Sequence, residues 1–131
     1  MAYLWVAIGG ALGSMARYGC SGLVGSLIGE TFPYGTLFVN VSGALMIGFF
    51  AGLSNPEGGY FIPVQGRLFL MTGICGGYTT FSTFSLETLD LMRDGEWAPA
   101  SMNIGLSVLA CIGAVWLGQA AALGFNRLKG A

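Results

Sequence analysis

The residues best suited to chemistry lie together in one tract, GGYTTFSTFS, which runs from Gly76 to Ser85. Two adjacent glycines are followed by five Thr or Ser residues among aromatic side chains. Glycine is costly inside a helix, and Thr hydroxyls can bond the carbonyl oxygens that a break would release. The tract therefore predicts a helix break at Gly76 and Gly77. Released carbonyls are hard ligands suited to a hard cation, although a kink made only for packing would also explain the glycine pair.

Two phenylalanines of this tract, Phe81 and Phe84, are three residues apart and would share one helix face. Ser82 and Thr83 place hydroxyl groups beside the rings. An aromatic ring is positive at its edge, so ring edges and hydroxyl donors turned into a passage would attract an anion. Packing of the two rings in a core is the simpler alternative.

Three further polar side chains occur in apolar stretches, namely Asn40, Ser107 and Cys111. The Asn40 amide is costly to leave without hydrogen-bond partners in hydrocarbon, so it must face protein or water. It either bonds a neighbouring helix or lines a passage. Ser107 and Cys111 are four residues apart and form a weakly polar stripe on one helix face, unless Ser107 only bonds its own backbone.

Arg17 and Glu87 are the charged residues closest to the apolar stretches. Charges inside a membrane usually face a cavity or a partner, so both are candidates for a vestibule, where Arg17 would also concentrate an anion. The alternatives are that Arg17 extends to the membrane interface and that Glu87 is solvated near the end of its span.

These residues must be positioned by membrane-spanning helices, because the composition is too apolar for a soluble domain. Hydrophobic residues make up 54% of the chain and charged residues 8%, and the mean hydropathy is +0.72. Soluble domains carry about 25% charged residues, and one span needs roughly 20 apolar residues. We therefore predict one all-α integral membrane domain over residues 1–131, with four spans at about 3–28, 36–53, 67–92 and 100–123.

Small residues recur at helical spacing and are predicted to bring helices close together. The pairs four residues apart are Gly9 with Gly13, Gly22 with Ser26, and Gly48 with Gly52. Basic residues, in contrast, give little preference for one orientation, since Arg67, Arg127 and Lys129 oppose Arg93 and Arg17 across the predicted membrane. Insertion in both orientations would permit an antiparallel dimer with a two-fold axis in the membrane plane.

Charge and residue usage exclude other functions. The net charge of −1, from six acidic and five basic residues, leaves no basic patch for nucleic acid. Histidine is absent, and no pair of carboxylates lies deep in a span, so an enzyme is not predicted.

The tract from Gly76 to Ser85, followed by Glu87, resembles the signature of the Fluc (CrcB) family of fluoride ion channels. GGALGSMARY, from Gly9 to Tyr18, resembles the family's first-span motif, and GTLFVN, from Gly35 to Asn40, resembles the entry to its second span. The resemblance implies a multi-pass protein of the bacterial inner membrane, an antiparallel dual-topology homodimer with two fluoride pathways and a broken third helix. Its expected role is passive fluoride export and resistance to environmental fluoride.

The resemblance also implies roles for individual residues. A structural Na⁺ at the dimer axis would be held by the backbone carbonyls of Gly76 and Thr79. The fluoride pathway and its vestibule would be formed by Phe81 and Phe84 as the phenylalanine pair, Asn40, the polar track of Ser82 and Thr83, Ser107 or Cys111 on the last span, and Glu87 as the vestibule acid.

The main alternative is a small multidrug-type proton-coupled antiporter, which shares four spans, a short chain and a dual-topology dimer. Such a protein needs a titrating carboxylate deep in the membrane. The first span has no Asp or Glu between Met1 and Gly29, and Glu87 lies toward the end of the third. A membrane scaffold without transport is a third reading, but it leaves the polar tract unexplained.

Overall fold

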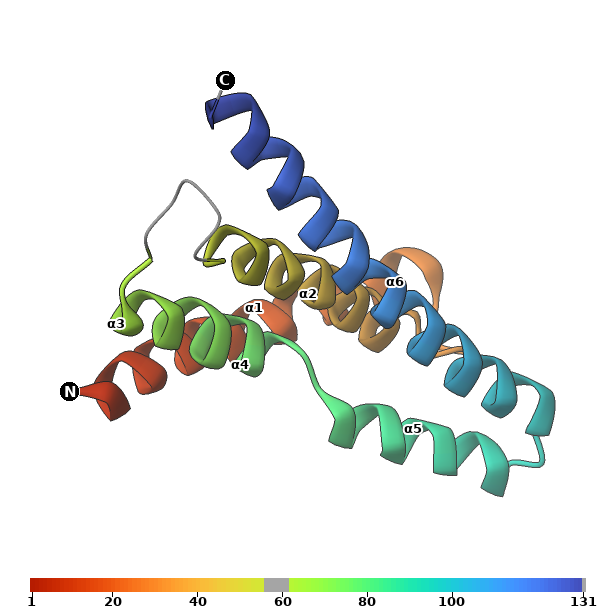
Figure 1. The fold of residues 1–131 in the computed structure, drawn as a ribbon. Helices are drawn as coiled ribbons and strands as arrows, with labels where there is room; N and C mark the ends of the chain where they lie inside the picture. Colours follow the sequence, from red (N-terminus) through yellow and green to blue (C-terminus); the bar gives the residue numbers. More distant parts are fainter. Residues whose placement is uncertain (56–61, 131) are drawn as a thin grey trace.

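The computed structural model describes residues 1–55 and 62–130, and its regular structure is helical (Figure 1). The described residues contain no strand, so the all-α prediction is confirmed. The connector expected between the second and third spans falls mainly on residues 56–61, which lie outside the described residues, as does the side chain of Lys129. The helical elements are α1 (Ala2–Ile28), α2 (Tyr34–Leu53), α3 (Val64–Arg67), η1 (Leu68–Cys75), α4 (Gly76–Tyr78), α5 (Phe81–Arg93) and α6 (Trp97–Gly130).

Glycine and proline mark the helix ends. Helix α1 stops at Gly29, whose φ is 110°, and Pro33 directly precedes α2. The turn between α5 and α6 contains Gly95 with φ of 78°. Positive φ values are cheap only for glycine, so these two positions fix where the chain reverses.

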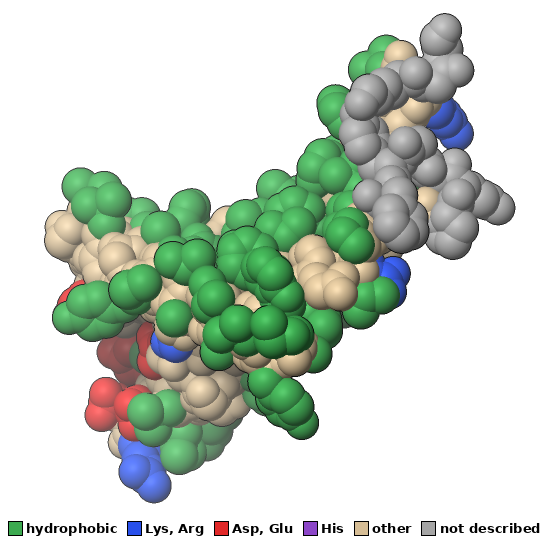
Figure 2. Space-filling view, turned by 90° about the vertical axis from the view of Figure 1, so that its left-hand side faces the viewer, with side chains coloured by type: hydrophobic (Ala, Val, Ile, Leu, Met, Phe, Trp, Pro, Cys, Tyr) green, Lys and Arg blue, Asp and Glu red, His purple; other side chains and the backbone are tan. Residues whose placement is uncertain are grey.

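Large apolar side chains face outward in this protein. Leu27 is 75% exposed, Leu109 74% and Trp116 67%, whereas the fully buried side chains include Val39 and Asn103. Figure 2 shows a face covered mostly by hydrophobic side chains, with the acidic side chains gathered toward one end. An apolar exterior around a core of small and polar residues suits a lipid solvent, so this is a membrane protein.

Among the described residues, two helices are long and apolar enough to cross a membrane, α2 and the part of α6 from Trp97 to Leu128. Helix α1 has 27 residues, but its glycines, serines and Arg17 make it less apolar than α2. The third predicted span is divided between α3, η1, α4 and α5, none of which is long enough by itself.

The first and third segments approach at van der Waals distance through glycines. A Cβ added to Gly9 would lie 2.9 Å from the Gly73 Cα and against the carbonyl oxygen of Phe69. One added to Gly13 would lie 2.9 Å from the Tyr78 nitrogen. Backbone contacts this close leave no room for a side chain, so the predicted packing role of Gly9 and Gly13 is confirmed.

Helices α2 and α6 cross in the same manner. A Cβ on Gly48 would meet the Val115 backbone, with 2.9 Å to its Cα, and one on Gly52 would lie 2.6 Å from the Ala122 Cβ. The third predicted pair differs, because Gly22 faces open space and the Ser26 hydroxyl donates to the Leu23 carbonyl of its own helix at 2.8 Å. Gly22 and Ser26 therefore pack against no second helix among the described residues.

The third segment runs as a continuous helix from α3 through η1 to α4. Its η1 portion is wider than an α-helix, as shown by the Gly76 N–H, which reaches the Met71 carbonyl five residues back. Helix α4 then ends at Tyr78, and α5 departs at an angle to pack alongside α6 (Figure 1).

The predicted position of the interruption, at Gly76 and Gly77, is wrong. Both glycines are helical, and the extended residues are Thr79, with φ −85° and ψ 156°, and Thr80, with φ −151° and ψ 116°. Gly77 serves close packing instead, because a Cβ there would lie 2.6 Å from the Gly10 carbonyl oxygen.

Candidate functional site

The centre of the site is the amide of Asn40, which α2 directs at the interrupted segment. Its Oδ1 accepts a hydrogen bond from the Thr80 N–H at 2.7 Å, and its Nδ2 donates to the Thr80 carbonyl at 3.0 Å. The side chain thus pairs with Thr80 as a neighbouring strand would. These two bonds satisfy backbone groups that the extended residue removes from the helix ladder. Asn40 therefore makes the predicted inter-helix bond, and it also lines a cavity described below.

Thr80 organises the start of α5 through its hydroxyl. The Thr80 Oγ1 accepts from the Thr83 N–H at 3.2 Å and donates to the Thr83 Oγ1 at 3.1 Å, and it lies 3.2 Å from the Ser82 Oγ. A Thr at this position caps the helix. The sequence analysis missed Thr80 as a site residue, although a Thr followed by a helical pattern is a cap signal that could have identified it.

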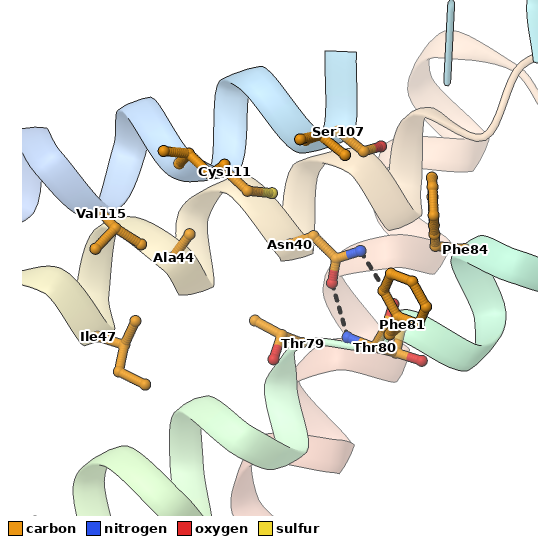
Figure 3. A pocket seen from close by; sticks show the side chains of 12 residues that line it. Asn40, Ala44, Ile47, Thr79, Thr80, Phe81, Phe84, Ser107, Cys111 and Val115 are labelled. Carbon is orange, nitrogen blue, oxygen red and sulfur yellow. Dashed lines mark hydrogen bonds between the residues drawn. The ribbon is translucent and has the colours of Figure 1, made fainter. Parts of the chain in front are cut away.

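A cavity of about 440 Å³ opens between α2, the α5 start and α6 (Figure 3). Its two ends differ in chemistry. Asn40, Thr80, Phe81, Phe84 and Ser107 lie toward one end, whereas Ala44, Ile47 and Val115 lie toward the other (Figure 3). The fold therefore brings together five residues predicted for the fluoride pathway: Asn40, Phe81, Phe84, Ser107 and Cys111.

Phe81 and Phe84 stand at the polar end of this cavity. Their ring centroids are 5.3 Å apart and their planes are inclined by 46°. Phe84 is only 8% exposed, but Phe81 is 78% exposed. Phe84 is thus a packed wall of the cavity, while Phe81 stands at its open side.

The last helix contributes both of its predicted residues, Ser107 and Cys111, to the lining of this cavity. Ser107 is 7% exposed and donates to the Asn103 Oδ1 at 3.4 Å. The Asn103 Nδ2 in turn donates to the Thr88 hydroxyl at 2.9 Å, and Thr88 donates to the Phe84 carbonyl at 2.7 Å. This buried chain fastens α5 to α6 behind Phe84.

The sequence analysis missed Asn103 and Thr88. Each is four residues from a predicted site residue, Asn103 before Ser107 and Thr88 after Phe84, so both share a helix face with one. That periodicity was the available signal.

A second cavity of about 630 Å³ lies on the other side of α5 and is lined in part by Thr83 and Glu87. Glu87 accepts a hydrogen bond from the Thr36 hydroxyl. Ser82 is exposed beside the first turn of α5. Thr80 lines the first cavity and Thr83 lines the second, so the hydrogen bond between their hydroxyl groups connects the walls of the two cavities.

Arg17 does not pair with Glu87. Its Nε donates to the Gly77 carbonyl at 3.0 Å, in a partly buried position. A cation at the C-terminal end of a helix is favoured by the helix dipole, so Arg17 stabilises the end of α4.

The carbonyls of Gly76 and Thr79 lie at the end of α4, where the backbone becomes extended. In an uninterrupted helix the Thr80 N–H would bond the Gly76 carbonyl, but here that N–H donates to Asn40. Thr79 is extended, and its N–H and hydroxyl both donate to the Cys75 carbonyl at 3.0 Å. These two oxygens suit a hard cation in donor type, but they are too few to surround one.

The fold and site together define a helical membrane protein whose polar amide, hydroxyl and aromatic groups line cavities beside an interrupted helix. The described residues contain no group of three or more His, Cys, Asp or Glu side chains placed to hold a metal ion.

Comparison with known proteins places the chain within this class. Residues 4–119 match the family described as CrcB-like protein, Camphor Resistance (CrcB), and the chain belongs to that family. A protein of Opitutus terrae named fluoride-specific ion channel FluC is 57% identical over 98% of this chain and 97% of its own length. Proteins with the same name from Methylocella silvestris and Rhodospirillum rubrum are 52% and 53% identical, over at least 97% of each chain. The resemblance stated from the sequence is thereby confirmed.

Proposed function

We propose that this protein is a passive, fluoride-selective ion channel that lets fluoride leave the cytoplasm. Relatives that are 52% to 57% identical over nearly the whole chain carry the name fluoride-specific ion channel. The observation that carries the proposal is the cavity at Asn40, where an amide, hydroxyls and two phenylalanine rings converge.

The cavity lining favours an anion over a cation or a proton. Its residues include Asn40, Thr79, Thr80 and Ser107, and none of them is an Asp, Glu, Lys or Arg. A small, strongly hydrated anion must replace lost water contacts with donors, and amide and hydroxyl groups can supply them without a fixed charge that would trap it. Ring edges of Phe81 and Phe84 would add weaker positive contacts.

The antiporter alternative is not favoured by the same geometry. Coupling to protons requires a carboxylate in the substrate cavity, and the nearest one, Glu87, lines the second cavity and is bonded to Thr36. A passive channel needs no such group. The membrane potential, worth about 2.3 kcal/mol per charge per 100 mV, would suffice to drive an anion outward.

We further propose that the chain crosses the inner membrane four times and works as an antiparallel homodimer. Two features support a partner chain. Phe81 is 78% exposed at the open side of the cavity, so one chain does not complete the lining. The two carbonyls of Gly76 and Thr79 would become four when a two-fold axis adds a second copy, which approaches the six or more oxygens typical of hard cations. We assign these carbonyls to a structural Na⁺.

The test uses liposomes that contain the purified protein and are loaded with potassium fluoride or potassium chloride. Valinomycin is added to carry K⁺, and anion release is followed with an electrode. We expect fast fluoride release and no chloride release above protein-free liposomes. Equal release of both anions, or no fluoride release, would contradict the proposal.

A further inference from the structure

One helical turn of α2 contacts three consecutive residues at the interruption. Asn40 binds the backbone of Thr80, as described above. Ser42 lies 2.9 Å from the Tyr78 hydroxyl. Gly43 packs against Thr79 and Tyr78. A Cβ added to Gly43 would meet the Thr79 methyl group and would lie 3.0 Å from the Tyr78 Cδ2.

The direction of the bond between Tyr78 and Ser42 follows from the other contacts of Ser42. The Ser42 Oγ lies 2.7 Å from the Phe38 carbonyl, which can only accept a hydrogen bond. The single Ser42 proton is therefore used within α2, and the Tyr78 hydroxyl must be the donor to Ser42. Tyr78 is 6% exposed, and besides Ser42 the Cys20 thiol, a weak acceptor, is the other side chain that contacts its hydroxyl.

We propose that Tyr78 and Ser42 are positioning residues, whose hydrogen bond holds the end of α4 against α2 and thereby sets the direction of the Thr79 carbonyl. Tyr78 is the last residue of α4, and the extended backbone begins at the next residue. Thr79 is tied on its other side to the Cys75 carbonyl. With Tyr78 fixed to α2 and Thr79 fixed to the last residue of η1, little freedom remains for the peptide that follows.

This inference rests on the proposed function, because it concerns the carbonyls assigned above to Na⁺. It predicts that loss of the bond weakens cation binding more than it weakens the fold. One neutral hydrogen bond corresponds to about a three- to tenfold change in an equilibrium constant.

The test is thermal denaturation of the purified, detergent-solubilised protein, titrated with NaCl at constant ionic strength against N-methyl-D-glucamine chloride. The variants are Tyr78→Phe, Ser42→Ala and the double variant. Tyr34→Phe and Ser26→Ala serve as matched controls, because Tyr34 is 39% exposed and the Ser26 hydroxyl bonds only its own helix.

We expect the unmodified protein to gain melting temperature with Na⁺, and Tyr78→Phe to need about three to ten times more Na⁺ for half of that gain. Ser42→Ala should be worse than Tyr78→Phe, because it leaves a buried phenol donor with only the weak Cys20 sulfur as acceptor, and the double variant should recover to the level of Tyr78→Phe. Neither control should change the Na⁺ midpoint.

A purely structural role would lower the melting temperature equally with and without Na⁺ and leave the midpoint unchanged, which would overturn the inference. The inference would also be overturned if the melting temperature of the unmodified protein did not change with Na⁺ concentration. That result would leave the fluoride pathway standing, because fluoride release from liposomes by the unmodified protein is measured independently. If Ser42→Ala does not fold, the Na⁺ concentration at half of the gain in melting temperature of Tyr78→Phe is sufficient to test the inference.

Discussion

Asn40 binds both backbone groups of Thr80, accepting from its N–H at 2.7 Å and donating to its carbonyl at 3.0 Å. The same amide lines the cavity that contains Phe81 and Phe84. One side chain thus holds the interrupted segment in place and forms part of the cavity wall. On the proposed pathway, this residue would serve both structure and transport.

Replacing Asn40 by Asp should abolish most fluoride transport. The carboxylate keeps an acceptor for the Thr80 N–H, but its second oxygen faces the Thr80 carbonyl and its charge repels an anion. We expect fluoride release from liposomes to fall at least about tenfold, which corresponds to about 1.4 kcal/mol. Gln65→Glu adds the same charge on exposed α3, outside both cavities, and should conduct as the unmodified protein does. Undiminished fluoride release by Asn40→Asp would count against a role for the amide.

Replacing either phenylalanine should reduce fluoride transport, but only the replacement of Phe84 should also reduce stability. Replacing either Phe81 or Phe84 by Ile removes a ring edge from the cavity, and fluoride release should fall severalfold in both variants. Only Phe84 is buried, so only Phe84→Ile should also destabilise the protein, by about 1–2 kcal/mol. Phe38→Ile, at a half-exposed position outside the Asn40 cavity, is the control. Unchanged transport in both cavity variants would refute the ring-edge argument.

Cys111 is the weakest hydrogen-bond donor among the polar residues of the cavity. Cys111→Ser should therefore raise fluoride release severalfold, as measured by initial rates in liposomes. A small cationic methanethiosulfonate should block a Cys20→Ser variant, which retains Cys111, and should not block Cys111→Ser. Block that persists in a Cys20→Ser, Cys111→Ser double variant would show that Cys75 is modified instead, and a Cys20→Ser variant that is not blocked would show that Cys111 does not face the pathway.

Neighbouring glycines of α1 should respond differently to a methyl group. Gly9→Ala places a Cβ 2.9 Å from the Gly73 Cα and 3.0 Å from the Ile74 nitrogen, so the two helices must separate. We expect a loss of about 1–3 kcal/mol, measured by thermal denaturation in detergent. Gly10→Ala meets nothing within 4 Å and should be neutral or slightly stabilising, since alanine favours the helix. Equal losses at both positions would contradict the packing described here.

Short-range sequence patterns were enough to predict the main helical segments, five of the residues that line the cavity and two of the three small-residue pairs. Phe81 and Phe84, like Ser107 and Cys111, share helix faces by spacing alone. The interruption lies three residues after the predicted position, because its place depends on contacts between distant segments. Gly77 packs on Gly10 in α1, and the Thr80 N–H finds its acceptor in Asn40, forty residues earlier. Short-range patterns do not encode either contact.

Short-range sequence patterns also could not predict which groups bond the charged side chains. Arg17 and the Gly77 carbonyl are sixty residues apart, and Glu87 and Thr36 are fifty-one residues apart. A single sequence shows that a charge in an apolar stretch needs a partner, but it does not show which group supplies one.

The most direct test of a passive fluoride pathway is the reversal potential of the current through the purified protein in a planar lipid bilayer. Fluoride is placed at a tenfold gradient, while chloride and pH gradients are varied independently. We predict a reversal potential that follows fluoride alone, at about 59 mV per tenfold gradient of a monovalent ion. A reversal potential that moves with the proton or chloride gradient would contradict the account.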